Sequence, residues 1–334
     1  MKLTTRLILA LIALSFSTTL GYAADGNVAY TDPDYVDSDF EIQGEYVGTL
    51  HDDPTHTLAV QVIALGNKKF RAVGFEGGLP GAGWNGEAGE QVEATLKDGF
   101  VTFAGDHGTG VTGHGAMVVL SGEGDQIAVL NKVYRKSPTL GKKPPKGAVV
   151  LFDGSGVDNF VRHRKGGPAV MTEDGLLTQG SNSKQTFGDH SVHVEFRLPY
   201  MPFSRGQGRG NSGCYLQGRY EVQMLDSFGL AGLDNECGGL YSVSKPAVNM
   251  CLPPLTWQTY DIDFTAARFD AEGNKIKNAR ITVRHNGVLI HDDVELPKGT
   301  PAGVSGEGAA KGPLHLQDHG NPVRYRNVWV VEKK

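Results

Sequence analysis

The stretch that most constrains the fold of this chain is an alternating segment near its middle, residues 210–226, which reads GNSGCYLQGRYEVQMLD. Successive side chains of a β-strand point to opposite faces. One face of the two runs is apolar and typical of a core: Cys214, Leu216, Tyr220, Val222 and Met224. If the phase holds across Gly218, the other face is polar: Tyr215, Gln217, Arg219, Glu221 and Gln223. The segment therefore predicts two neighbouring strands with one core face and one polar face.

The polar face admits two interpretations. A row of long polar side chains is compatible with a solvated sheet face, which would more often carry Lys, Thr and Ser. The mixture found here, one guanidinium, one carboxylate, two amides and a phenol, suits a sugar better. Amides, carboxylates and guanidinium groups each hold neighbouring hydroxyls by paired hydrogen bonds. We therefore expect a carbohydrate ligand on this face.

The rest of the chain predicts an all-β protein. Forty-six glycines without a repeat period indicate many tight turns between short strands. No convincing helix can be placed, and His285-Asn286-Gly287-Val288 is a strong hairpin signal. Strands are expected at 40–49, 57–65, 70–75, 91–96, 100–104, 115–121, 128–134, 148–152, 192–198, 239–243, 258–264, 279–285, 288–290, 314–317 and 323–331. Many antiparallel strands without intervening helices predict packed sheets, with a jelly-roll sandwich in the second half.

Composition divides the chain into segments. Residues 25–137 are expected to form a small N-terminal antiparallel β module of unknown role, and residues 147–334 the jelly roll. Residues 138–146 are a linker by composition, stiffened by Pro138 and Pro144-Pro145 and kept solvated by lysines.

The N-terminus predicts export. Residues 1–24 combine a positive start, an apolar run and a small-residue cleavage site after Ala23 or Ala24, the pattern of a secretory signal peptide. We therefore expect a periplasmic or extracellular protein, and no stretch is apolar enough to predict a membrane span. A net charge of −5 and the absence of blocks of like charge argue against a nucleic-acid partner.

Three cysteines remain in the mature chain. In an oxidising compartment, Cys237 and Cys251, which flank a Gly- and Pro-containing loop, are expected to pair. Cys214 lies in the core phase and is expected to be a small buried apolar residue, with a nucleophilic thiol as the weaker alternative. Metal spacing of the CxxC type is absent.

Several ordered motifs resemble a known family. They are LFDG at 151–154, residues 210–229, ECGGLY at 236–241, WQTYDIDF at 257–264, ITVRHNGVLIH at 281–291 and LQDHGNPVRYRNVWV at 316–330. The second domain thereby resembles the 3-keto-disaccharide hydrolase domain, a bacterial family with a concanavalin/laminarinase-like jelly roll. The resemblance implies cleavage of 3-keto-glycosides by hydrolysis, or by 1,2-elimination followed by hydration. It does not extend to residues 25–137.

Such chemistry needs three groups. A ketone at C3 acidifies the C2 proton, so the site requires a base at C2, a group that holds the enediolate oxygen and an acid at the leaving oxygen. Glu221 is the first candidate for the base or for a metal ligand, with a salt bridge to Arg219 or Arg324 as the structural alternative. Arg219 would hold the enediolate, and a bound divalent metal ion could do the same. Glu236 is the second carboxylate, or else a residue on the rim of a loop.

The remaining candidates are an acid and a set of sugar contacts. His319 would protonate the leaving group, or stabilise its turn together with Asp318. The expected substrate contacts are Tyr215, Gln217, Gln223, Tyr241, Asn249, Gln317 and Arg324. An ordinary glycosidase of this fold would carry a second acid near Gln223, and its absence argues against that chemistry. The alternative function is a non-catalytic carbohydrate-binding β-sandwich.

Overall fold

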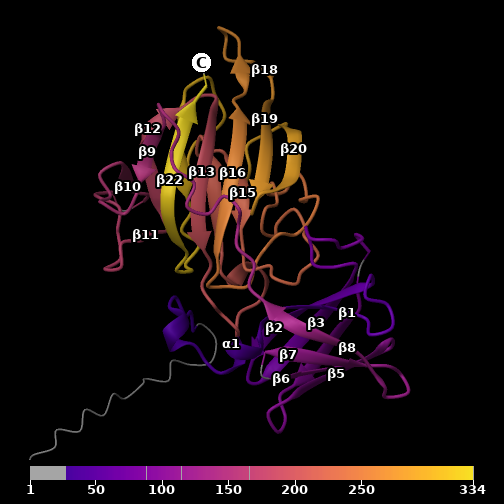
Figure 1. Cartoon of the computed structure of the whole chain (residues 1–334). Coiled ribbons are helices and arrows are strands. Elements are labelled where there is room, and N and C mark those ends of the chain that lie inside the picture. Colours follow the sequence, from indigo (N-terminus) through magenta and orange to yellow (C-terminus); the bar gives the residue numbers. More distant parts are fainter. Residues whose placement is uncertain (1–27, 88, 114, 165, 334) are drawn as a thin grey trace, which may run out of the picture.

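The computed structural model describes residues 28–333 except 88, 114 and 165, so the predicted signal peptide lies outside the described residues. Figure 1 shows two bodies of β-structure, with the chain passing once from the first to the second. The helices of the described part are short: the 3-10 turns η1 (Pro33–Tyr35) and η2 (Gly206–Gly208), and α1 (Asp39–Ile42). None of them is long and apolar enough to cross a membrane.

The first body is one antiparallel sheet in the order β4-β3-β2-β1-β8-β7-β6-β5. Its edge strands, β4 and β5, are consecutive in the chain and joined at a Lys97–Phe100 pairing, so the sheet curls back on itself. An apolar cluster that includes Tyr46, Phe70 and Leu130 fills its interior. The strands are β1 (Gly44–Thr49), β2 (Thr57–Gly66), β3 (Lys69–Glu76), β4 (Gln91–Thr95), β5 (Val101–Gly105), β6 (Gly108–Gly113), β7 (Ala116–Leu120) and β8 (Gln126–Val133).

The second body is a sandwich of two antiparallel sheets, which confirms the predicted all-β jelly-roll class. The five-stranded sheet has the order β10-β12-β21-β14-β15, and the larger sheet the order β11-β22-β13-β16-β19-β20, with β9 paired to β22. The strands of the five-stranded sheet are β10 (Phe160–Arg162), β12 (Ser181–Phe187), β14 (Ser212–Leu216), β15 (Tyr220–Met224) and β21 (Gly312–Leu316). Those of the larger sheet are β9 (Val149–Phe152), β11 (Leu177–Thr178), β13 (His190–Arg197), β16 (Trp257–Thr265), β19 (Ala279–His285), β20 (Val288–Leu296) and β22 (Arg324–Glu332). The small pair β17 (Arg268–Phe269) and β18 (Lys275–Lys277) extends one connection.

The central hairpin β14–β15 forms as the alternation predicts. Tyr215 pairs with Glu221 and Cys214 with Val222, so the two faces separate as expected. The predicted apolar face is fully buried in the core between the sheets. The phase fails only at the corner, because Gln217 takes a positive φ of 53° and lies with Gly218 and Arg219 in the turn.

Some elements differ from prediction. The predicted strand at 239–243 is a turn, held by hydrogen bonds from Val243 and Ser244 back to Leu240. The strands β6, β10 and β12 and the helix α1 were not predicted. The sequence of β6 is GTGVTG and that of β12 SNSKQTF, so neither carries the apolar alternation on which strand prediction rests.

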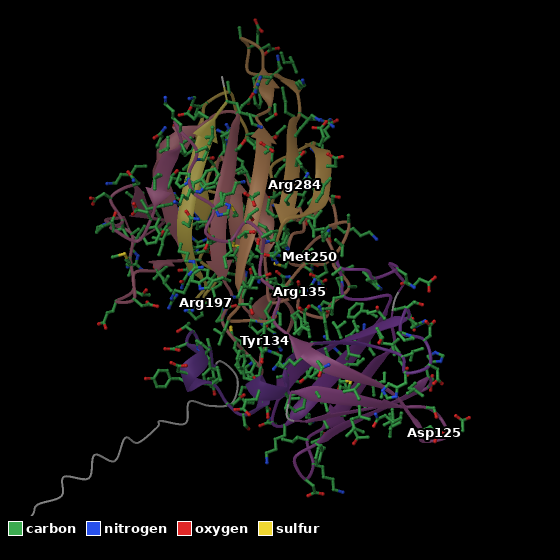
Figure 2. The ribbon with its side chains drawn as sticks, viewed as in Figure 1. Asp125, Tyr134, Arg135, Arg197, Met250 and Arg284 are labelled. Carbon is green, nitrogen blue, oxygen red and sulfur yellow. The ribbon has the colours of Figure 1, made fainter. Side chains whose placement is uncertain are left out.

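The two bodies share an apolar core. Side chains from β2 and β3, such as Ile63 and Val73, belong to the same buried cluster as Phe228 and Met250 of the second body. The approach is close at Gly229, where an added Cβ would lie 2.3 Å from the Ile63 Cδ1. Figure 2 places Tyr134, Arg135 and Met250 at this junction. The two bodies are therefore packed against each other through a continuous apolar core.

The three cysteines are free and buried, which contradicts the predicted Cys237–Cys251 disulfide. Cys237 lies 3.3 Å from the Tyr260 hydroxyl, and Cys251 lies 3.5 Å from the Leu225 carbonyl oxygen. The two thiols also interact with each other, so the prediction was right about their proximity and wrong about the covalent bond. Cys214 is a core residue as predicted, and burial raises the pKa of its thiol to about 12, which makes it a poor nucleophile.

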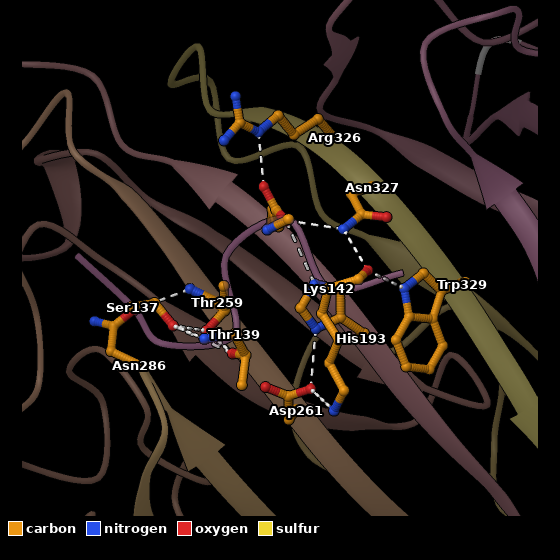
Figure 3. A network of polar contacts seen from close by, with 12 residues as sticks. Ser137, Thr139, Lys142, His193, Thr259, Asp261, Asn286, Arg326, Asn327 and Trp329 are labelled. Carbon is orange, nitrogen blue, oxygen red and sulfur yellow. Dashed lines mark hydrogen bonds and ion pairs between the residues drawn. The ribbon is translucent and has the colours of Figure 1, made fainter. Parts of the chain in front are cut away.

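The predicted linker is not a solvated spacer along its whole length. Figure 3 shows that residues 137–142 lie along the outer face of the larger sheet in a polar network. The Gly141 N–H donates to Glu195, the Lys142 ammonium donates to Asp261, and the Lys142 carbonyl oxygen accepts from Asn327 and Trp329. His193, fully buried, lies between the two carboxylates. We call residues 137–142 the strap.

Electrostatic interactions with Asp261, His193 and Glu195 hold the strap in place. Burial raises the pKa of Asp261, but hydrogen bonds from His193 and Thr139 outweigh it and lower the pKa to about 2. Burial lowers the pKa of His193, but its bonds to Asp261 and Glu195 outweigh it and raise the pKa. Because the pKa of Asp261 is depressed, its contribution to stability is present above its usual pKa and is lost as the pH falls towards 2.

We predict that Asp261→Ala loosens the strap. Loss of a buried charged partner typically costs about 1–3 kcal/mol, so tryptic cleavage after Lys142 should become at least about tenfold faster under native conditions. Mass spectrometry of timed digests measures this. Asp263→Ala is the matched control, because Asp263 lies two residues away on the same strand and pairs with Lys333 at the surface. Equal cleavage of the two variants would contradict the role assigned to the network.

Candidate active site

A row of polar side chains crosses four strands of the five-stranded sheet on the face turned away from the core. Asn182 of β12 pairs with His315 of β21, which pairs with Tyr215 of β14, which pairs with Glu221 of β15. Directly cross-strand neighbours point to the same side and touch. The row is not solvated, because loops that include residues 300–309 cover it: the Tyr215 hydroxyl lies 3.0 Å from the Pro301 carbonyl oxygen.

Glu221 is the most perturbed member of the row. It is 3% exposed, and the Tyr215 hydroxyl donates to its Oε2 at 2.7 Å. Burial raises the pKa of Glu221 to about 8, and the hydrogen bond from Tyr215 offsets only part of that effect. Neither Arg219 nor Arg324 forms an ion pair with it in the described structure, so the salt-bridge alternative is wrong. A carboxyl group that titrates near neutral pH is suited to acid–base catalysis.

Gly213 makes room for this carboxyl group. It lies opposite Gln223, on the face that carries Tyr215 and Glu221. A Cβ at this position would lie 2.1 Å from the Glu221 Oε1 and 2.9 Å from the Tyr215 ring. The glycine is therefore required by close approach to the carboxyl group.

A cavity of about 490 Å³ opens over one end of the row. It contains buried His315 and half-buried Gln317, and its exposed rim includes Arg164, Asp318 and His319. The other lining residues are Arg162, His163, Gln179, Gly180 and Ala302. Gln317 connects the cavity to the acid, because its Nε2 donates to the Tyr215 hydroxyl oxygen at 3.0 Å. Its Oε1 is buried without a partner among the described residues, as expected of a group that binds a ligand or water.

Two histidines at the cavity are joined by Asn182. The His315 Nδ1 lies 2.6 Å from the Asn182 Oδ1, and the Asn182 Nδ2 lies 3.5 Å from the His163 Nδ1. This assigns the proton of neutral His315 to Nδ1. Burial, together with the charges of His163 and Arg164, lowers the pKa of His315 to about 3. His315 is therefore neutral at working pH, and its ring packs on Tyr215 with centroids 5.3 Å apart.

The structure brings together only part of the predicted site. Tyr215, Glu221 and Gln317 form the connected group above, and His319 lies on the cavity rim. Tyr241 lies close enough to Tyr215 to affect its pKa. Arg324 approaches the cavity through Gln179, whose Oε1 is 3.3 Å from the Arg324 Nη1.

The other predicted residues hold loops. Arg219 donates to Gln217 and to the Gly308 carbonyl oxygen in the turn, and Gln217 donates to the Phe187 carbonyl oxygen. Gln223 donates to Gln207 at 3.0 Å. Glu236 accepts from the backbone N–H groups of residues 232 and 233, so it is a loop residue, which was the structural alternative predicted for it. Asn249 donates to the carbonyl oxygens of residues 227 and 230. None of these five residues lines the cavity. Tyr215 and Glu221 do not line it either, but they are connected to it through Gln317.

The sequence reasoning missed His315, Asn182, His163, Arg162, Arg164 and Gln179. His315 carried a usable signal, because it lies two residues before Gln317 and shares its face by strand alternation. Asn182 carried none, because β12 was not predicted as a strand.

A metal site does not emerge from these residues. No group of three His, Cys, Asp or Glu side chains placed to hold a metal ion is found in the described part of the chain. The residues present do not fit an all-protein metal centre, so no step below is routed through one.

Comparison with known proteins now identifies the second body. A family model described as the 3-keto-alpha-glucoside-1,2-lyase-like domain matches residues 147–331. The chain belongs to this family. The family makes it a carbohydrate-active protein, and the resemblance predicted from the motifs is confirmed.

One solved structure agrees with this assignment. A candidate glycosyl hydrolase from Parabacteroides distasonis is 33% identical with a TM-score of 0.52, and the match covers 57% of this chain and 85% of that protein. A second candidate glycosyl hydrolase from the same organism is 17% identical with a TM-score of 0.43, covering 57% and 95%. A comparison with curated proteins found no match.

The raised pKa of Glu221 predicts a specific pH dependence of stability. A group whose folded pKa is raised stabilises the fold fully below its unfolded pKa, near 4.5, and loses that contribution as the pH rises through about 8. Wild type should therefore lose stability relative to Glu221→Gln across this window, by about 5 kcal/mol at most. Urea unfolding at a series of pH values measures the difference. A constant difference from pH 4 to pH 9 would show that Glu221 titrates normally.

Proposed function

We propose that this protein is an exported enzyme that cleaves 3-keto-glycosides by 1,2-elimination, followed by hydration, or by hydrolysis. The observation that carries the proposal is the Glu221–Tyr215–Gln317 chain, which connects a buried carboxyl group with a pKa of about 8 to a polar cavity. Membership of the 3-keto-alpha-glucoside-1,2-lyase-like family supports it. A cavity of about 490 Å³ suits a mono- or disaccharide.

The first step uses the acidity of the C2 proton beside the C3 ketone. Ionised Glu221 accepts the proton of the Tyr215 hydroxyl while the Tyr215 oxygen accepts the proton from C2. The Gln317 Nε2–H, already 3.0 Å from that oxygen, stabilises the negative charge that develops on it. Neutral His315 packs on the Tyr215 ring and acts as a positioning residue.

The second step breaks the C1–O bond. The electron pair of the enediolate forms the C1=C2 double bond, and the leaving oxygen takes the C1–O pair together with a proton. His319, on the cavity rim, is the group in reach of a leaving group that points to solvent. Addition of water across C1=C2 then gives the net result of hydrolysis. No second carboxylate across the bond is needed, unlike in an ordinary glycosidase.

We predict that the protein releases the aglycone from 4-nitrophenyl 3-keto-glucoside but not from the corresponding glucoside, because only the ketone acidifies C2. Glu221→Gln and Tyr215→Phe should each lower kcat/KM by about 10²–10⁴-fold. Glu272→Gln removes an exposed carboxylate and is the matched control, expected at wild-type rate. Release of 4-nitrophenol, followed by absorbance, measures all four proteins.

Other results of these assays would lead to different conclusions. Saturable binding of the keto-glucoside without release would favour the non-catalytic carbohydrate-binding sandwich. Wild-type activity in Glu221→Gln would remove the proposed base. A divalent ion stays a prediction, and loss of activity in EDTA that Mg²⁺ or Mn²⁺ restores would establish it.

The same mechanism predicts the pH profile. Because the base must be ionised, kcat/KM should rise with pH and level off above the pKa of Glu221, about 8, when removal of the C2 proton limits the rate and the later proton transfer from His319 does not. A profile that falls through this range would instead assign Glu221 as the acid. Stopped assays between pH 5 and pH 10, with Glu272→Gln as control, decide between the two.

Export and the division into domains complete the proposal. We propose that residues 1–24 are removed on export, that residues 138–146 are the connection between two domains, and that residues 25–137 support the loops of residues 147–334. N-terminal sequencing of the exported protein tests the first of these.

A further inference from the structure

One rim of the cavity is basic, although the chain as a whole carries a formal charge of −5. Residues 162–165 read RHRK, four basic residues in a row. Arg162, His163 and Arg164 all line the cavity, together with His315 and His319, against a single carboxylate, that of Asp318. The Asp318 Oδ1 is already engaged by the Gly320 N–H at 3.0 Å.

The local backbone presents these residues. The Arg162 N–H donates to the Gly167 carbonyl oxygen, and Val161 pairs with Pro168, so Arg162 and Gly167 are held together at the end of β10. Within it Arg164 adopts a positive φ of 65° and is exposed. The His163 N–H donates to the Gly180 carbonyl oxygen, which fixes the turn against the start of β12.

The two guanidinium groups have no carboxylate partner in the described part of the protein. Some other arginines of this chain are neutralised, as Arg268 is by Asp189 and Arg280 by Asp293, whereas exposed Arg284 has no carboxylate partner among the described residues and does not line the cavity. The neighbouring groups feel the resulting positive potential. Burial lowers the pKa of His163, and the charge of Arg164 lowers it further. An unneutralised guanidinium pair at a cavity rim is the usual recognition device for carboxylate, sulfate or phosphate groups.

The position of the pair relative to the acid indicates which part of a ligand carries the charge. β10 lies three strands from β14, which carries Tyr215. At about 4.8 Å per strand, this is about 14 Å, more than the width of one sugar ring even when the reach of an arginine side chain is subtracted. A group bound by Arg162 and Arg164 is therefore attached to the unit next to the reacting ring.

We propose that Arg162 and Arg164 form an anion subsite, which selects glycosides whose leaving group carries a carboxylate, sulfate or phosphate next to the 3-keto ring. The selectivity in turnover rests on the proposed function, whereas the binding of an anion by the two arginines does not. The anion would be held at the rim by the two guanidinium groups while the ketone ring lies over His315 and Gln317.

The experiment compares 3-keto-glucosides whose leaving phenols are of similar acidity and differ mainly in charge: neutral 4-carbamoylphenyl against 4-carboxyphenyl, 4-sulfophenyl and 4-phosphophenyl. We expect kcat/KM for the three anionic substrates to exceed that for the neutral one by about five- to tenfold at low salt, and the ratio to fall towards one in 0.5 M NaCl. The three anions distinguish which group the subsite prefers. A ratio near one at low salt, with turnover intact, would overturn the subsite and leave the proposed function standing.

Variants give a second, independent readout. Arg162→Gln and Arg164→Gln should each reduce the anionic-to-neutral ratio at least threefold, and Arg162→Lys/Arg164→Lys should retain part of it. Arg284→Gln is the matched control: it removes one exposed positive charge from β19 of the larger sheet (Figure 2) and should keep the wild-type ratio. An equal ratio in all variants and wild type would overturn the assignment.

Binding separates the two proposals when turnover is absent. Calorimetric titration of full-length Glu221→Gln with the carboxylated and neutral keto-glucosides measures the affinity difference without catalysis. A preference for the carboxylated ligand that Arg162→Gln abolishes supports the subsite even if wild type releases nothing, an outcome that would overturn the proposed function alone. Equal affinities would overturn the subsite.

Discussion

The removal of the Glu221 carboxyl group from water is the constraint around which the second body is arranged. A carboxyl group in the middle of a strand is normally solvated or paired with a cation, and here it has neither. The structure accepts it because Gly213 leaves space beside it and Tyr215 donates to it. Its burial is what moves its pKa to about 8, so the same feature that weakens the fold at high pH makes the group useful as a base.

The support for this arrangement comes largely from outside the five-stranded sheet. The Thr300 Oγ1 accepts from the Glu221 N–H, and its own hydroxyl donates to the Arg219 carbonyl oxygen, so the covering loop is fixed to the edge strand. On the opposite side, Arg209 forms a buried pair with Asp226 and donates to the Ala64 carbonyl oxygen of the N-terminal module. The strap fixes the relation of the two bodies from the other sheet. The N-terminal module thus contacts the segments that precede β14 and follow β15, and helps to hold them in place.

The sequence predicted the elements whose side-chain pattern matches their environment. The apolar face of β14 and β15, the Asn286-Gly287 hairpin and the long strands β13, β16 and β22 follow from alternation and turn chemistry. It failed where tertiary contacts override pattern: β12 is polar because one of its faces lies under the site, and the turn at Gln217 breaks the phase that placed Arg219 beside Glu221. The pairing of Asn182 with His315, 133 residues apart in sequence, depends on the sheet order, which local patterns do not encode.

The distribution of charge along the polar row separates two tasks that an ordinary glycosidase combines. Two carboxylates across a glycosidic bond must serve as acid and as base or nucleophile. Here the row contains one carboxyl group, and the position where a second acid would be expected is occupied by Gln223, which donates to Gln207. In the proposed reaction the second carboxylate is unnecessary, because the C3 ketone of the substrate stabilises the carbanion. One buried acid then suffices for proton transfer. Basic residues close to that acid would lower its pKa, so they are placed on the far rim of the cavity. The separation of Glu221 from Arg162 and Arg164 across the sheet keeps the pKa of Glu221 high while allowing a positive rim.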